Sequence, residues 1–135
     1  MSANRSTSLA GRQWMALAAG AVLMLALVAC SSGASQPANG RCVVTPGASP
    51  QATVKIANLA FGPAVTIKAG GAVVFINNDS TTHTVTQGTG GQAAANACVD
   101  EHVSVGQSVT VTFSQPGDYQ ITCTIHKMQT VVHVQ

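Results

Sequence analysis

Short apolar runs separated by turn residues fill the sequence from Ala52 to Gln135. The run Val109-Thr-Val-Thr-Phe113 alternates apolar and polar residues, with the period of two that a half-buried β-strand requires. The run Val73-Val-Phe-Ile76 is continuously apolar, which is typical of a buried strand. No convincing amphipathic helix pattern accompanies these runs. The sequence therefore predicts an all-β domain, a two-sheet β-sandwich of seven or eight strands.

Two stretches lack this strand pattern. Residues 31–50 are rich in Ser, Gly, Ala and Pro, and we expect a flexible tether there, which Cys42 can pin to the domain that follows. Residues 87–97 are rich in Gly and Ala, and we expect a loop with one helical turn. The expected organisation is a signal over residues 1–29, a tether over 30–50 and a folded domain over 51–135.

The N-terminal segment is typical of an export signal. Arg5 and Arg12 precede an uncharged, mostly apolar run from Trp14 to Ala29, which is shorter than the ~20 residues of a membrane span. The run ends in Leu27-Val28-Ala29-Cys30, which resembles a bacterial lipobox and implies a lipid on Cys30. We therefore expect an exported protein, anchored by lipid to the extracytoplasmic face of a bacterial membrane. An ordinary signal peptide or an uncleaved anchor, with Cys30 uninvolved, is the alternative.

A cysteine, a histidine and a methionine lie close together near residue 125. They are Cys123, His126 and Met128, and His83 lies upstream after a polar segment. Cys123 shares one face of an alternating strand with Tyr119, so its sulfur is expected to point into the sandwich. One thiolate, two imidazoles and one thioether are the ligands of a blue-copper electron-transfer site. The set therefore predicts copper bound at adjacent strand ends.

The stretch from about Ala52 to Gln135 resembles a cupredoxin of the plastocyanin/amicyanin group. The resemblance is carried by Phe61-Gly-Pro, Gly70-Gly-Ala-Val-Val-Phe-Ile-Asn77-Asn-Asp79, His83-Thr-Val and Gly117-Asp-Tyr119-Gln-Ile-Thr-Cys123-Thr-Ile-His126. It implies a Greek-key, cupredoxin-like fold and one copper ion per chain, with His83, Cys123 and His126 as equatorial ligands. It also implies that Thr84 links the two ligand loops, where the family often has Asn or Ser.

The axial ligand is where this sequence departs from the family. Related proteins place Met three or more residues after the second histidine, usually with a Gly soon after, whereas Met128 follows His126 by two positions. We expect Met128 as the axial ligand, because a thioether is the commoner weak axial partner. Gln129 is the alternative, and its harder oxygen would lower the reduction potential. His102 and His133 are expected to be solvated or hydrogen-bonded rather than ligands.

The remaining cysteines are consistent with export. With Cys30 assigned to lipid and Cys123 to metal, Cys42 and Cys98 form an even pair in an oxidising compartment. We expect a disulfide between them, with a stabilisation of about 4 kcal/mol in the chain-entropy model. Two free buried thiols are the alternative.

Charge restricts the partners. From Cys30 onward, four basic and four acidic side chains balance, and no basic stripe is present, so nucleic-acid binding is not expected. We expect a monomer that carries single electrons between redox proteins at the membrane and docks by apolar contact around His126, as the resemblance implies.

Two other classes of function are consistent with parts of the sequence. A copper-binding module for delivery or storage is the first alternative, although such modules usually offer Met-rich and His-rich surfaces; zinc in the same ligands is a further possibility. A cysteine hydrolase built on Cys123 and His126 lacks an orienting third residue. Multicopper and binuclear centres need His-x-His motifs or a second bridging cysteine. We therefore do not expect a self-contained catalyst.

Overall fold

The computed structural model of the protein describes residues 42–135. The expected signal over 1–29, the lipidated Cys30 and the tether up to residue 41 lie outside the described residues. Within residues 42–135, no helix is long and apolar enough to cross a membrane.

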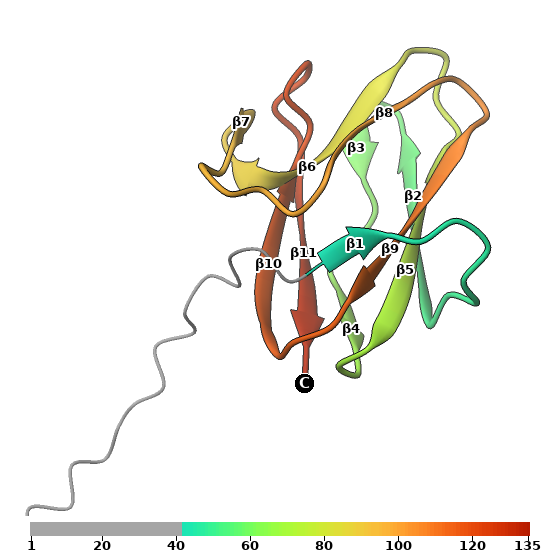
Figure 1. Cartoon of the computed structure of the whole chain (residues 1–135). Helices are drawn as coiled ribbons and strands as arrows, with labels where there is room; N and C mark the ends of the chain where they lie inside the picture. The colour runs from blue at the N-terminus through green and yellow to red at the C-terminus, as the bar shows by residue number, and fades with distance from the viewer. Residues whose placement is uncertain (1–41) are drawn as a thin grey trace, which may run out of the picture. The chain divides into compact units, whose positions relative to one another are not determined.

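Two β-sheets pack face to face, and the predicted all-β sandwich is confirmed (Figure 1). One sheet has the strand order β1-β9-β5-β2-β3, and the other has the order β4-β11-β10-β6-β7, with β8 also paired to β6. The strands are β1 (Cys42–Val44), β2 (Ala52–Ala57), β3 (Ala60–Phe61), β4 (Val65–Ile67), β5 (Gly71–Asn77), β6 (His83–Thr89), β7 (Gln92–Ala93), β8 (Asp100–Val103), β9 (Ser108–Phe113), β10 (Gly117–Thr122) and β11 (Gln129–Val134).

The core lies between the sheets and follows the alternation of the strands. Tyr119 and Ile121 of β10 are fully buried, and so is Cys123, which continues the same face beyond the strand. Phe113 of the other sheet meets Tyr119 edge to face, with ring centroids 4.7 Å apart. Apolar contact between the sheets therefore fixes β10, the strand that leads into Cys123.

Three details differ from the expectations. Cys42–Val44 forms β1 and pairs with β9, so the sheet includes part of the range assigned to the tether. Residues 87–97 are only partly a loop, because β6 continues to Thr89 and a short hairpin leads into β7; the expected turn is confined to residues 94–97, where the N–H of Ala97 donates to the carbonyl of Ala94 at 3.1 Å. The strand segments from β1 to β11 exceed the seven or eight expected, since short pieces such as β3 and β7 have no periodic signal of their own.

The predicted disulfide between Cys42 and Cys98 is confirmed. It joins β1 of one sheet to the segment that precedes β8 of the other. Because Cys42 pairs with Phe113 while Cys98 donates its N–H to the buried side chain of Gln87, the bridge ties the two layers together.

Connections between strands gather at one end of the sandwich. Figure 1 shows the β5–β6, β10–β11 and β2–β3 connections at its upper end. β6 begins with His83, and the β10–β11 connection contains Cys123, His126 and Met128. The topology therefore brings the sequence-predicted ligands, which lie far apart in the chain, to the same end of the six-stranded sheet.

Candidate metal centre

Three ligand atoms converge at this end of the sandwich. The Sγ atom of Cys123 lies 3.8 Å from Nδ1 of His83 and 3.8 Å from Nδ1 of His126. The two Nδ1 atoms are 3.1 Å apart. A point equidistant from these three atoms lies about 2.1 Å from each, close to metal bonds of ~2.0–2.1 Å to His nitrogen and ~2.3 Å to Cys sulfur. The three residues therefore fit a metal ion in a trigonal N₂S arrangement.

Burial makes this set suitable for a metal. Cys123 and His83 are 0% exposed, and His126 is partly exposed. The thiolate and imidazoles suit copper, whereas carboxylate oxygens would suit Mg²⁺ or Ca²⁺. Among residues 42–135, His83, Cys123 and His126 form the group of metal-binding side chains found close together.

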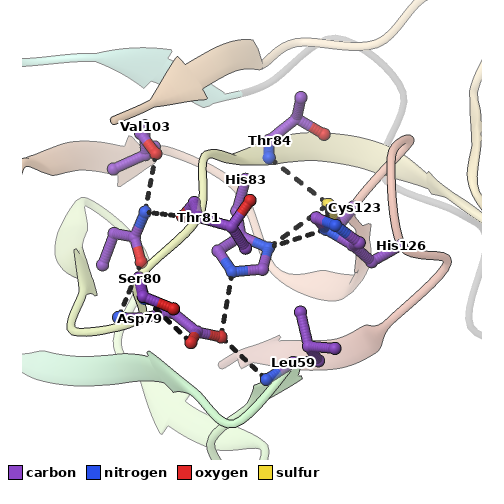
Figure 2. Close-up of polar contacts among 10 residues, drawn as sticks. Leu59, Asp79, Ser80, Thr81, His83, Thr84, Val103, Cys123 and His126 are labelled. Carbon is purple, nitrogen blue, oxygen red and sulfur yellow. Dashed lines mark hydrogen bonds and ion pairs between the residues drawn. The ribbon is translucent and has the colours of Figure 1, made fainter. Parts of the chain in front are cut away.

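His83 is oriented by a carboxylate. Its Nε2 atom lies 3.2 Å from Oδ2 of Asp79, on the side of the ring opposite the ligand atom (Figure 2). Asp79 also accepts the backbone N–H of Leu59 at 2.7 Å and that of Ser80 at 2.9 Å. These N–H groups, Leu59 first, together with His83, hold the pKa of the Asp79 carboxyl below its usual value. The carboxylate is therefore fixed as an acceptor beside the ring.

Asn77 holds the loop that carries Asp79. This buried side chain accepts the N–H of Asp79 at 2.9 Å and donates to the carbonyl oxygens of Thr81 and Val103, each at 2.8 Å. The oxygen and the nitrogen of the Asn77 amide are thus both hydrogen-bonded, to the β5–β6 connection and to β8. The contact of Asp79 with His83 does not follow from strand patterns in the sequence; the spacing Asn77-x-Asp79-x₃-His83 is the signal that points to it.

Thr84 joins the two ligand segments, as the resemblance implied. Its N–H points at Sγ of Cys123 at 3.4 Å, and its hydroxyl oxygen accepts the N–H of Thr124 at 2.8 Å. The Thr84 hydroxyl also lies 3.1 Å from the hydroxyl of Thr124. Thr84, next to His83, is therefore hydrogen-bonded to Thr124, next to Cys123. This hydrogen bond fixes the separation of the two ligands.

The short ligand loop closes through backbone hydrogen bonds. The N–H of Cys123 donates to the carbonyl of Met128 at 2.9 Å, and the N–H of Lys127 donates to the carbonyl of Cys123 at 2.8 Å. Lys127 has φ of 59°, in the left-handed region that glycine favours. The loop between His126 and Met128 therefore contains a lysine in a backbone conformation that usually requires glycine.

The two axial candidates have different surroundings. Met128 is 8% exposed and packs with the core cluster that contains Cys123. Gln129 is exposed and begins β11, where it pairs with Thr122. Burial in the cluster that includes Cys123 favours Met128 over Gln129.

The other histidines lie elsewhere. His102 is exposed on β8. His133 is 45% exposed and its Nδ1 lies 2.7 Å from Oδ1 of Asp118 on the neighbouring strand. Neither histidine belongs to the converging set.

Comparison with known proteins decides the family. The family model of copper binding proteins, plastocyanin/azurin family, matches residues 48–135, which include every residue of the converging set. The chain belongs to this family. Members of the plastocyanin/azurin family are cupredoxins, which are electron carriers rather than enzymes.

Solved structures of amicyanin resemble this cupredoxin. A Cu(I) form of one amicyanin point mutant is 25% identical, with a TM-score of 0.60, and the match covers 70% of this chain and 99% of that chain. The reduced state of another mutant is 27% identical, with a TM-score of 0.57 and the same shares covered. The cupredoxin described here has one type 1 copper site, formed by His83, Cys123 and His126 with Met128 as the fourth residue.

Proposed function

We propose that this cupredoxin carries single electrons between redox proteins. The observation that carries the proposal is the buried convergence of one thiolate and two imidazoles from strand ends that other contacts hold in place. Copper bound by these residues supplies a one-electron couple between Cu(I) and Cu(II). The chain's own contribution is a ligand geometry that the fold fixes in advance, so a change of oxidation state needs little rearrangement.

His83 and Cys123 have defined roles in this proposal. The Asp79 carboxylate accepts a hydrogen bond from the Nε2–H group of His83. The proton of the neutral ring therefore lies on Nε2, and the Nδ1 lone pair faces the site. The N–H of Thr84 faces the Cys123 sulfur, where it stabilises negative charge on the thiolate. Met128 is the proposed axial ligand in preference to Gln129, since the thioether side chain is the buried one.

His126 is the proposed route for the electron. It is partly exposed, whereas His83 and Cys123 are fully buried. Two exposed apolar residues belong to the same end of the molecule: Ile125, which precedes His126 and is 48% exposed, and Leu59, which is 55% exposed and bonded to Asp79. We propose that a redox partner docks on this apolar surface around His126, by contact rather than by charge steering.

Metal delivery is the competing function. A delivery protein has to release its ion, whereas the ligands here are buried and joined to one another through Thr84. Direct voltammetry of the copper-loaded protein separates the two functions. We expect a reversible one-electron wave with unchanged metal content after repeated cycles. Loss of copper on each reduction would support delivery instead.

The site of action is also a proposal. The apolar run before Cys30 and the lipobox-like sequence support export and a lipid anchor, with the protein working as a monomer on the extracytoplasmic membrane face. Residues 31–41 would then let the cupredoxin reach membrane-associated partners. Cys30→Ser should move the protein from the membrane fraction to the soluble fraction. Unchanged membrane association would contradict the lipid anchor.

A further inference from the structure

The tip of the β6–β7 hairpin lies against the ligand loop. The N–H of Gly91 donates to the hydroxyl oxygen of Thr122 at 2.9 Å. A methyl group on the Cα of Gly91 would lie 2.7 Å from Cγ of Lys127 and 3.5 Å from its Cα. An alanine at this position would therefore have to displace the Lys127 side chain, which lies between His126 and Met128 in the sequence. The hairpin thus packs against Lys127 of the ligand loop and is hydrogen-bonded to Thr122, the last residue of β10.

Thr122 passes this contact on to the ligand loop. Its hydroxyl is buried and donates to the carbonyl oxygen of Met128 at 3.0 Å while accepting the N–H of Gly91. The Met128 carbonyl also accepts the N–H of Cys123. A chain of hydrogen bonds thus connects Gly91 to Thr122 and Thr122 to Met128. Met128 is also hydrogen-bonded to Cys123 through the backbone.

The hairpin is itself held firmly. The N–H of Ala94 donates to the carbonyl of Gln87 at 2.8 Å, and the side-chain oxygen of Gln87 accepts the N–H of Cys98 at 2.8 Å. Cys98 is bonded covalently to Cys42 in the other sheet. The tip therefore projects from a segment that both sheets anchor.

The ligand loop, residues 123–128 between β10 and β11, has features that call for contacts from outside the loop. It is short, and Lys127 takes up a left-handed conformation that is unfavourable for a residue with a Cβ atom. Unfavourable backbone conformations persist where surrounding contacts hold them in place. A metal site also loses precision when the groups behind its ligands are loose.

We propose that the β6–β7 hairpin braces the ligand loop and sets the position of Met128 relative to Cys123, with Gly91 and Thr122 as positioning residues. The inference rests on the proposed function only in so far as Met128 is a copper ligand. The brace itself is a property of the protein without copper. It gives the segment 88–97, which has no strand pattern in the sequence, a role in the electron carrier.

Two adjacent glycines provide a matched pair of variants. Gly90 and Gly91 both have positive φ, 61° and 83°, so alanine is strained at either position. At Gly90 an added methyl group meets no atom within 4 Å, whereas at Gly91 it meets Lys127. The difference between Gly90→Ala and Gly91→Ala therefore isolates contact with the ligand loop from backbone strain.

The variants are compared in copper affinity, in EPR spectrum and in the NMR signal of the Met128 methyl group. Disturbing the groups behind a metal ligand typically costs about 10- to 100-fold in affinity, so we expect Gly91→Ala, which displaces Lys127, to weaken copper binding to that extent and to alter the EPR spectrum. It should also shift the Met128 methyl resonance of the copper-free protein. Gly90→Ala should leave all three unchanged. Equal behaviour of the two variants would overturn the proposal.

Two further variants keep the test decisive if Gly91→Ala folds poorly. Thr122→Val removes the bridging hydroxyl without changing the backbone, and it should shift the Met128 methyl resonance in the same way. Adding Lys127→Gly to Gly91→Ala removes the clashing side chain and should restore the wild-type signals. Failure of both predictions refutes the brace. Because the methyl resonance is read without copper, this result is separate from failure of the copper function.

Discussion

The Nε2 atom of His83 lies 3.2 Å from Oδ2 of Asp79, while Nδ1 of the same ring faces Cys123 and His126. An ionised carboxylate only accepts hydrogen bonds, so it selects the tautomer in which Nε2 carries the proton. Negative charge beside a ligand ring also increases the electron donation of that ring to a bound metal. Asp79 is thus in a position to favour the higher oxidation state of copper.

Asp79→Asn should therefore raise the reduction potential. Loss of a group that supports a metal ligand usually costs 10- to 100-fold in affinity. If that loss falls on Cu(II), the potential rises by about 60 to 120 mV, since a tenfold change is ~59 mV for one electron. Spectroelectrochemical titration measures the shift. The control is Asp118→Asn, which breaks the exposed pair of Asp118 with His133. Similar shifts in both variants would contradict a specific role for Asp79.

The axial position has its own pair of variants. Met128→Leu should change the visible and EPR spectra and raise the potential by at least about 60 mV, because removal of a weak donor leaves Cu(II) less stabilised. Gln129→Leu should change neither, since Gln129 is exposed at the start of β11. Spectral change in Gln129→Leu with none in Met128→Leu would reverse the assignment.

The disulfide should contribute stability without contributing to the copper centre. Cys42 and Cys98 are 56 positions apart, and closing such a loop is worth about 4 kcal/mol in the chain-entropy model. Replacing both cysteines by Ala should lower the free energy of unfolding in denaturant by about that amount, while the copper spectrum stays the same. A large spectral change would show that the bridge also shapes the site.

Electron exchange should depend on the apolar surface around His126. Ile125→Lys places a charge in the proposed docking surface and should slow electron self-exchange between two copies by about tenfold, which corresponds to ~1.4 kcal/mol. Val43→Lys is the control, because Val43 is similarly exposed at 59% but lies on β1 of the other sheet. Equal slowing in both variants, measured by NMR line broadening, would argue against docking at Ile125.

Much of the site follows from local rules of sequence. The alternation that buries Tyr119 and Ile121 also directs Cys123 inward, and the two-residue spacing to His126 places both ligands at one strand end. His83 was predictable as the first residue of a strand after a polar connection. The pairing of Cys42 with Cys98 followed from counting cysteines in a chain that is expected to be exported.

The remaining features depend on contacts between segments without periodicity. The three residues of β1 have too little length to show a strand pattern within a stretch rich in Ser, Gly and Pro. The fit of Gly91 beside Lys127 depends on how a hairpin folds over a sheet, which glycine content alone does not indicate. Likewise, the register of β10 with β11 decides that Met128 is buried and Gln129 is exposed, and the sequence alone does not predict that register.

Titration of the metal-free protein with Cu(II) tests the central claim most directly. Convergence of Cys123, His83 and His126 predicts that the protein binds one equivalent of copper. The bound copper should give an intense visible absorption from charge transfer between sulfur and copper, which makes the solution blue. Cys123→Ser should abolish this charge-transfer absorption, whereas the double variant Cys42→Ala/Cys98→Ala should retain it. Absence of the absorption in the wild-type protein, or its persistence in Cys123→Ser, would contradict a type 1 copper centre at these residues.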